Sequence, residues 1–313
     1  MDDPLAEATR IIAVVVTYQP ELSALACLLD AVLPQVEAVV VVDNGSETDV
    51  AAWLAGRGAA AVHGINLGEN RGIAVAQNIG IAWAGKEGAE YVLLFDQDSE
   101  PAPDMVARLL AAAKKLIAAG HRVAAVGPRH GDPRRDRPWP FIRLQGLRLK
   151  RCACEQPQAV IPAGHLISSG SLIPMRTLAA VGGMTESLFI DYVDIEWCLR
   201  AQHQGYQSFG VCDAVMTHAL GEEPVRFLGR TFSMHSPLRY YYQFRNAVWL
   251  CRRPWLSVGW KYTFGWRLLY KYGVYGLIGR PRLASLRMMT KGFWHGMRGY
   301  SGRCPEKREQ MYF

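Results

Sequence analysis

The chain contains no uninterrupted apolar run of about 18 residues, the length that a membrane-spanning helix needs. Its first residues, Met1-Asp2-Asp3-Pro4, are acidic and lack a basic segment followed by an apolar stretch, so we expect no secretory signal. Charged residues make up 20% of the 313 residues, whereas 50% are hydrophobic and 10% aromatic, which excludes intrinsic disorder for most of the chain. This length and composition fit one large α/β domain with an appendage, or two modest domains.

Cysteine is scarce, and its seven copies are scattered along the chain. The only close pair, Cys152 and Cys154, has one residue between its members, whereas zinc sites usually have two to four. We therefore expect neither a disulfide framework nor a zinc module, and we interpret the cysteines as buried, unpaired thiols. This usage is typical of a reducing compartment, and the cytoplasm is the expected location.

Acidic residues are rare in the last part of the chain. From Gly221 to the end there are 17 of the 35 basic residues but only 4 of the 28 acidic ones. The same segment holds 20 of the 32 aromatic residues. A basic, aromatic-rich tail behind an acidic body indicates a polyanionic surface as partner.

The first 130 residues alternate between strand and helix patterns, which predicts a largely parallel, doubly wound α/β sheet. The predicted strands are Ile11–Val16, Val39–Val42, Ala60–Val62, Tyr91–Phe95 and Val123–Val126, and the predicted helices are Glu21–Pro34, Glu47–Ala55, Ile73–Trp83 and Pro103–Ala119.

The middle of the chain is less regular, and the end is helical. We expect a surface excursion at His130–Arg151, strand character at Leu166–Pro174, a helix at Tyr192–Gln204, and short strands at Gln207–Phe209 and Val215–Thr217. From Ser236 onward the pattern indicates helices without strands. Trp255–Ile278 carries three spaced basic residues, which suits a helix lying in a membrane interface or a helical cap on the core.

Polar residues follow three of the predicted strands, where ligands bind in open α/β sheets. They are Thr17-Tyr18, Asp43-Asn44 and Asp96-Gln97-Asp98. The two carboxylates of the third group can hold a hard divalent cation, Mg²⁺ or Mn²⁺, that bridges a diphosphate; the alternative is an ordinary surface turn. Asp43 suits a contact to a nucleobase or ribose, or equally a turn in which Ser46 caps the next helix.

Three further features are candidates for chemistry. Arg71 lies in a glycine-containing loop before a helix, which suits phosphate binding or a plain connection. Asp191, Asp194 and Glu196 cross a strand-to-helix junction, where an ionised carboxylate can act as a general base or cap the helix. His218 follows a short strand and is either a structural residue or a metal ligand.

These segments, in this order, resemble the GT-A family-2 glycosyltransferases. More narrowly, they resemble the bacterial dTDP-L-rhamnose-dependent rhamnosyltransferases of rhamnolipid, O-antigen and exopolysaccharide synthesis. The resemblance covers about residues 11–300. The segments that carry it are Val15-Val16-Thr17-Tyr18, Val41-Val42-Asp43-Asn44-Gly45-Ser46, Asn70-Arg71-Gly72-Ile73-Ala74, Leu94-Phe95-Asp96-Gln97-Asp98-Ser99, Leu166-Ile167-Ser168-Ser169-Gly170-Ser171, Leu188-Phe189-Ile190-Asp191-Tyr192-Val193-Asp194, and Ser236-Pro237-Leu238-Arg239-Tyr240-Tyr241-Tyr242 with Arg245-Asn246.

The resemblance implies a GT-A fold and a role for each matching residue. The residues implied to bind the nucleotide sugar are Thr17, Tyr18, Asp43, Asn44, Arg71, Asp96, Gln97, Asp98 and Arg245. Asp98, Asp96 and His218 would hold the metal, Mg²⁺ or Mn²⁺. Asp194 would be the catalytic base, and because Val193 replaces the Glu found in many relatives, Asp191 is an alternative base.

The implied activity is inverting, metal-dependent transfer of L-rhamnose from dTDP-L-rhamnose to a glycolipid or lipid-linked saccharide. The implied organisation is a catalytic domain at residues 1–235, with a nucleotide-sugar half at about 10–130 and an acceptor half at about 160–235, and a basic helical extension at 236–313. That extension would face the anionic inner surface of the cytoplasmic membrane, with no nucleic acid as partner. The alternatives are another nucleotide sugar, an Asp-x-Asp phosphohydrolase, or a non-catalytic polyanion-binding protein.

Overall fold

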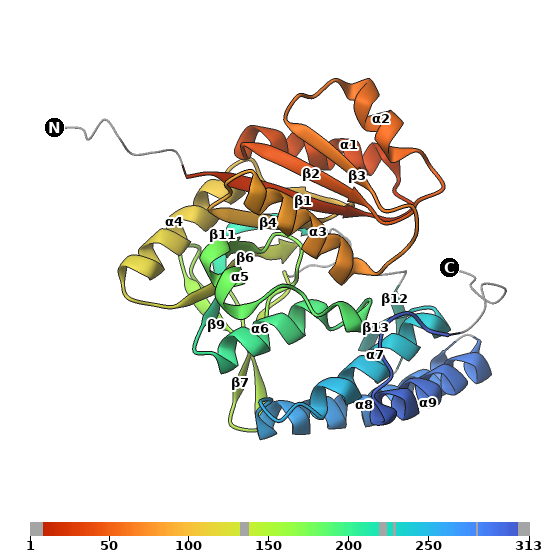
Figure 1. Cartoon of the computed structure of the whole chain (residues 1–313). Coiled ribbons are helices and arrows are strands. Elements are labelled where there is room, and N and C mark those ends of the chain that lie inside the picture. Colours follow the sequence, from red (N-terminus) through yellow and green to blue (C-terminus); the bar gives the residue numbers. More distant parts are fainter. Residues whose placement is uncertain (1–8, 132–137, 219–223, 228–229, 280, 306–313) are drawn as a thin grey trace.

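The computed structural model describes residues 9–131, 138–218, 224–227, 230–279 and 281–305, and the acidic start of the chain lies outside them. Its centre is a nine-stranded sheet in the order β3-β2-β1-β4-β10-β6-β11-β5, with β9 paired to β11 (Figure 1). The strands of this sheet are β1 Ile11–Thr17, β2 Ala38–Asp43, β3 Val62–Asn66, β4 Tyr91–Asp96, β5 Ser99–Pro101, β6 Val123–Gly131, β9 Val160–Ala163, β10 Leu172–Pro174 and β11 Gln207–His218.

Helices cover both faces of this sheet. The helices of the first 235 residues are α1 Leu22–Val32, α2 Val50–Arg57, α3 Ile73–Lys86, α4 Met105–Ala118, α5 Met175–Val181 and α6 Val193–His203, with short 3₁₀ turns at Leu33–Gln35 and Glu186–Leu188. Alternate side chains of β1 point to opposite faces: Val14 packs in the core under α3 and α6, and Val15 packs in the core under α1 and α4. The prediction of an α/β sheet with helices on both faces is therefore confirmed, but the sheet is mixed rather than largely parallel, because β10 is antiparallel to β4 and β6 and β11 is antiparallel to β5 and β9.

The β-branched runs pair as the sequence pattern predicts. Val14 of β1 is in register with Val40 of β2 and Leu94 of β4, and both pairings are parallel. Strands whose two faces are both covered by helices read as continuous hydrophobic runs, because no residue faces water. The parallel pairing brings the carboxyl ends of β1, β2 and β4 to one edge of the sheet.

Several local expectations were wrong. Helix α2 begins at Val50 with Asp49 as its N-cap, not Ser46, because the Asp49 side chain accepts a hydrogen bond from the Ala52 amide. The expected surface excursion contains a hairpin of β7 Phe141–Gln145 and β8 Arg148–Cys152. The two short strands expected after α6 are one strand, β11, whose pairing with β6 has two register shifts.

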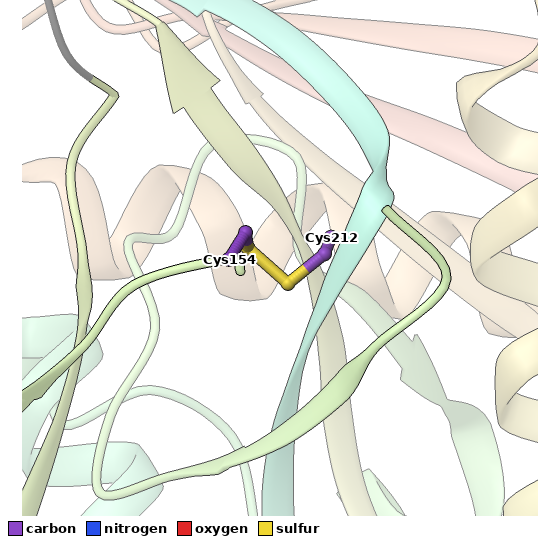
Figure 2. Close-up of a disulfide and its surroundings, with 2 residues drawn as sticks. All are labelled: Cys154 and Cys212. Atoms are coloured by element: carbon purple, nitrogen blue, oxygen red, sulfur yellow. A yellow bond between two sulfur atoms is a disulfide. The ribbon is translucent and has the colours of Figure 1, made fainter. Parts of the chain in front are cut away.

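One pair of cysteines is bonded, contrary to the expectation of unpaired thiols. Cys154 lies in the segment after β8, and Cys212 lies in β11, 58 residues further along (Figure 2). Pairing of β9 with β11 returns the intervening chain to the sheet and brings the two residues together. The sequence does not predict this disulfide, because the two cysteines are 58 residues apart. Cys198 and Cys304 are buried free thiols, as expected.

The chain ends in helices α7 Pro237–Cys251, α8 Val258–Ile278 and α9 Arg282–Arg298, after a hairpin of β12 Pro224–Phe227 and β13 Arg230–Ser233. Helix α7 is buried along most of its length, because α8 and α9 pack against it and the sheet domain lies on its other side (Figure 1). No helix in the described ranges combines the length and apolar character needed to cross a membrane.

Candidate active site

A cavity of about 630 Å³ opens where the carboxyl ends of β1, β2 and β4 meet the N-terminus of α6 and the sides of α7 and α8. Its lining brings together seven of the residues that the sequence singled out: Tyr18, Asn44, Asp96, Gln97, Asp98, Asp191 and Asp194. These residues are up to 176 positions apart in the chain. The topology of the sheet, rather than any local motif, assembles this cavity.

The end of the cavity nearest β1 and β2 is built from amides. The Asn44 side chain accepts a hydrogen bond from the Arg71 backbone amide at 2.9 Å and donates one to Asn70 Oδ1 at 3.2 Å. Asn70 also accepts a hydrogen bond from the Gly72 amide at 3.0 Å. The loop before α3 is thereby tied to the end of β2, and the amide groups of Asn44 and Asn70 give this part of the lining uncharged polar atoms that suit a nucleoside.

Four residues implied to bind the nucleotide sugar, Thr17, Asp43, Arg71 and Arg245, do not line the cavity. Asp43 is 3% exposed, and its carboxylate accepts hydrogen bonds from Thr17 Oγ1 and from the Ser46 amide and hydroxyl. These contacts fix the turn after β2, which is the structural alternative considered for Asp43. The Arg71 backbone is bound to Asn44, but its side chain is not part of the lining.

The segment Asp96-Gln97-Asp98 forms the turn between β4 and β5 and lines the middle of the cavity. Gln97 binds the backbone of Tyr18 in both directions, accepting from the amide at 2.8 Å and donating to the carbonyl at 3.2 Å. The Asp96 amide donates to Ser169 Oγ at 3.1 Å. These bonds hold the turn between β1 and the loop before β10, so that both carboxylates stand at the cavity.

His218 ends β11, where its backbone pairs with Ser99, the residue that follows Asp98. Its side chain lies outside what the structure describes. Among the described side chains, no three His, Cys, Asp or Glu residues come close enough to form a complete metal site.

Asp194 is in the first turn of α6 and lines the cavity together with Asp191. Burial, with smaller contributions from the nearby Asp96 and Asp191 carboxylates, raises the pKa of the Asp194 carboxyl to about 6, against the lowering effect of a hydrogen bond from the Ile195 amide at 2.8 Å. Such a group is ionised at neutral pH and more basic than an ordinary aspartate. Asp191 instead pairs with Arg239, Nε to Oδ2 at 3.4 Å, so it is the poorer proton acceptor.

The third acid of this junction is structural. Glu196 is buried and binds Arg200 at 2.8 Å and the Thr185 hydroxyl at 2.8 Å. The residue that precedes the helix is Tyr192, which makes no side-chain cap. Neither Asp191 nor Asp194 occupies the capping position, and both carboxylates point to the cavity.

The chain just before α6 has an unusual backbone. Phe189, Asp191 and Tyr192 all have positive φ angles, between 62° and 65°, which side-chain-bearing residues rarely adopt. Gly72, also at positive φ, lies so close to this turn that a Cβ atom would stand 2.7 Å from the Phe189 carbonyl oxygen. Strain of this kind persists only where surrounding contacts impose it, and it is concentrated at functional sites.

Two neighbours on α7 impose this conformation. Asn246 donates its side-chain amide to the carbonyls of Leu188, Ile190 and Asp191 at 2.7–2.9 Å. Arg245 is 1% exposed and donates to the carbonyls of Ser187, Leu188 and Gly302. Arg245, implied above to bind the nucleotide sugar, does not line the cavity. Its contacts make it a positioning residue for the turn that carries Asp191.

The sequence patterns missed other residues of the lining. Gln77 is 2% exposed, donates to Ser168 Oγ at 2.7 Å, and has a side-chain oxygen with no hydrogen-bond partner among the described residues. Arg239, Gln243, Arg267 and Lys271 come from α7 and α8. The positive charges of Arg239, Arg267 and Lys271 were visible in the sequence, but they were assigned to a membrane-facing tail. Only the packing of the helices shows that these three side chains line the cavity.

Comparisons with known proteins agree with this arrangement. Residues 13–173 match the model of the glycosyl transferase family 2. The chain is 38% identical over 247 residues to the dTDP-rhamnosyl transferase RfbF of Shigella flexneri, covering 78% of this chain and 81% of that protein. It is 29% identical over 279 residues to the galactofuranosyltransferase GlfT1 of Mycobacterium tuberculosis, covering 80% and 88%.

Solved structures share the fold at low sequence identity. GalNAc-T7 with UDP, GalNAc and Mn²⁺ superposes with a TM-score of 0.61 at 15% identity, covering 94% of this chain and 56% of that one. Residues 1–349 of Staphylococcus aureus TarS in complex with UDP-GlcNAc superpose with a TM-score of 0.55 at 14% identity, covering 93% and 92%.

Proposed function

We propose that this chain, which belongs to glycosyltransferase family 2, transfers L-rhamnose from dTDP-L-rhamnose to a hydroxyl group of a glycolipid or lipid-linked saccharide, with inversion at the anomeric carbon. The donor is suggested by the similarity to a dTDP-rhamnosyl transferase over most of both chains. Because the chain is a glycosyltransferase, the alternatives of a phosphohydrolase and a non-catalytic polyanion-binding protein are set aside.

The observation that carries the proposal is that one cavity gathers three kinds of group. The amides of Asn44 and Asn70, the carboxylates of Asp96 and Asp98, and the carboxyl of Asp194 all line it, and Asp96 is close enough to Asp194 to raise its pKa. We assign these groups to the nucleoside, the diphosphate and the acceptor hydroxyl, respectively. The reacting anomeric carbon would then lie between Asp98 and Asp194.

Asp194 acts as the general base in this mechanism. Its carboxylate removes the proton of the acceptor hydroxyl as the oxygen attacks the anomeric carbon, while the bond to the diphosphate breaks and its electrons leave with dTDP. A base with a pKa of about 6 combines a large ionised fraction at neutral pH with a strong pull on the proton. Single displacement from the face opposite the diphosphate inverts the configuration.

Asp96 and Asp98 would hold Mg²⁺ or Mn²⁺. Two carboxylates from one turn fit this ion, because Mg²⁺ is usually bound by one or two carboxylates and takes its other ligands from phosphate oxygens and water. An ion bound there neutralises charge that develops on the departing diphosphate. The His218 backbone is paired beside this turn, which makes the histidine a third candidate ligand.

The last helices would lie against an anionic membrane surface. Helix α8 exposes Tyr262, Trp266 and Leu269 at helical spacing, and α9 exposes Leu283, Trp294 and Met297 together with Arg282 and Arg298. Trp266 and Leu269 have exposed fractions of 62% and 70%, which is unusual for such large apolar side chains in water. Aromatic and basic side chains together favour the interface of an anionic bilayer.

Vesicle flotation at low salt tests the membrane contact. The wild-type protein should float with vesicles that contain anionic lipid, and a Trp266→Ser/Leu269→Ser variant should remain in solution. Val160→Ser, which changes an exposed apolar residue of β9, is the matched control. Equal flotation of all three proteins would reject this surface. We propose that residues 1–235 form the catalytic domain and that residues 236–313 make the membrane contact.

A donor panel tests the activity itself. Hydrolysis of dTDP-L-rhamnose, dTDP-D-glucose, UDP-galactose and UDP-GlcNAc is measured with no acceptor, and transfer is then followed by mass spectrometry with lipid and oligosaccharide acceptors. We expect dTDP-L-rhamnose to be consumed fastest and the product to gain one deoxyhexose. Faster turnover of a UDP-sugar would replace the proposed donor, and retained anomeric configuration would reject the single displacement.

A further inference from the structure

One end of the cavity is rich in positive charge. Arg239 of α7 and Arg267 and Lys271 of α8 all line it, next to Gln243 of α7. Lys271 Nζ donates a hydrogen bond to Gln243 Oε1 at 2.8 Å. Within the described part of the chain, the only carboxylate paired with any of the three is Asp191, which binds Arg239. Three positively charged side chains are therefore offset by one paired carboxylate.

Nearby ionisable groups do not remove this excess. Burial and the charge of Arg267 lower the pKa of Lys271 to about 8, which leaves it mostly protonated at pH 7. Burial and the nearby Arg239 lower the pKa of His235 to about 4, so it is neutral. An ammonium group beside two guanidinium groups is repelled by both of them, and an anion bound between them would relieve this repulsion. The arrangement retains about two positive charges, which match a dianionic ligand.

The positive end lies on the acceptor side of the proposed base. Asp194 is close to both Asp96 and Asp191, and Asp191 in turn contacts Arg239. The close approaches therefore run from Asp96 to Asp194, from Asp194 to Asp191, and from Asp191 to Arg239. A donor diphosphate at Asp96 and Asp98 would be separated from the cations by the base. The anion that meets them then belongs to the other substrate.

Building on the proposed function, we propose that Arg239, Arg267 and Lys271 form a subsite that binds a phosphate or diphosphate group carried by the acceptor. The planar guanidinium groups can each present two donors to phosphate oxygens, and Lys271 adds a point charge held in place by Gln243. The subsite would select acceptors whose reactive sugar is joined to a lipid through phosphate. It would also fix the distance between that phosphate and the hydroxyl beside Asp194.

Binding of three ligands with the same lipid chain tests this subsite. Geranyl diphosphate, geranic acid and geraniol are titrated calorimetrically into the full-length protein, both free and saturated with dTDP and Mg²⁺. The test variant is Arg267→Gln/Lys271→Met. The control is Lys261→Met/Arg287→Gln, which removes the same charges from α8 and α9 away from the cavity lining.

We expect the wild type and the control to bind geranyl diphosphate in the presence of dTDP, more tightly than geranic acid and far more tightly than geraniol. The test variant should lose at least tenfold in affinity for geranyl diphosphate and keep its affinity for dTDP within twofold. Equal binding by the test variant, or equal affinity for geranic acid, would overturn the phosphate subsite.

Competition distinguishes the two substrates as the source of the phosphate. Displacement of geranyl diphosphate by dTDP, with weaker dTDP binding by the test variant, would assign the cations to the donor and overturn the inference. The proposed donor is judged separately, from dTDP binding to the wild type. If dTDP does not bind, the donor is wrong, and titration of geranyl diphosphate into the free protein still decides the subsite.

Discussion

Asn246 of α7 donates its side-chain amide to the backbone carbonyl of Asp191 at 2.8 Å. The same amide reaches the carbonyls of Leu188 and Ile190. A helix from the end of the chain thereby fixes a turn in which Phe189, Asp191 and Tyr192 have positive φ. The position of Asp194 at the cavity depends on this turn, because α6 begins directly after it.

Replacing Asn246 by Ala should therefore slow the reaction without weakening donor binding. We expect kcat to fall about tenfold or more, since a small displacement of a catalytic group is costly, while the Kd for dTDP stays within twofold. Each buried carbonyl left unpaired costs about 1–3 kcal/mol, so the thermal midpoint should fall as well.

Gln35→Ala is the control for that loss of stability. Its side chain also bridges backbone groups, accepting from Val106 and donating to Ala31 and Ala102, but it does not line the cavity. It should lower the thermal midpoint and leave kcat unchanged. An Asn246→Ala enzyme with normal kcat would remove the positioning role from this residue.

Asp194→Asn should reduce kcat by about 10²–10⁴, because proton removal in the transition state typically contributes that much. The folded state and dTDP affinity should be preserved, as judged by circular dichroism and calorimetry. Asp191→Asn should have a smaller effect, since Asp191 is already paired with Arg239. The reverse ranking of the two variants would make Asp191 the base.

The same Asp194→Asn variant should be more stable than the wild type at neutral pH. The pKa of Asp194 is raised from 3.8 to about 6 in the folded protein, so folding favours its protonated form. The protonated carboxyl of Asp194 therefore stabilises the folded wild type at low pH. This stabilisation is lost as the pH rises from about 4 to about 6, and it is absent above that range. Asn, which is neutral at every pH, avoids the loss.

The gain in unfolding free energy should be about 1–3 kcal/mol at pH 7 and should shrink toward pH 4. Thermal unfolding of both proteins across this range, in EDTA so that no metal contributes, measures the difference. A difference that is constant with pH would show that the carboxyl charge is not its cause.

Chelation of divalent metal should abolish sugar transfer, and added Mg²⁺ or Mn²⁺ should restore it. The physical reason is that the crowded carboxylates Asp96 and Asp98 need a cation before a diphosphate can approach them. Asp98→Asn should raise the metal concentration needed for half-maximal activity at least tenfold. Full transfer after thorough dialysis against EDTA would reject the metal.

The sequence by itself determined the sheet and the identity of most polar residues at its edge. The continuous hydrophobic runs of β1, β2 and β4 indicate strands buried on both faces, and parallel pairing then places Tyr18, Asn44 and Asp96 at one edge of the sheet. Local pattern carries this information because a strand covered on both faces has apolar side chains at successive positions. The acids at the start of α6 were visible in the same way, whereas the choice of Asp194 among them came from the family resemblance.

The tertiary structure alone decided what the last helices do. The basic, aromatic composition of residues 236–313 predicted helices and a polyanionic partner, but composition does not say which side of a helix meets the core. Packing turned Arg245 and Asn246 toward the turn before α6, and Arg239, Arg267 and Lys271 toward the cavity. It also joined Cys154 to Cys212. These contacts link residues far apart in the chain, and only their three-dimensional arrangement sets them.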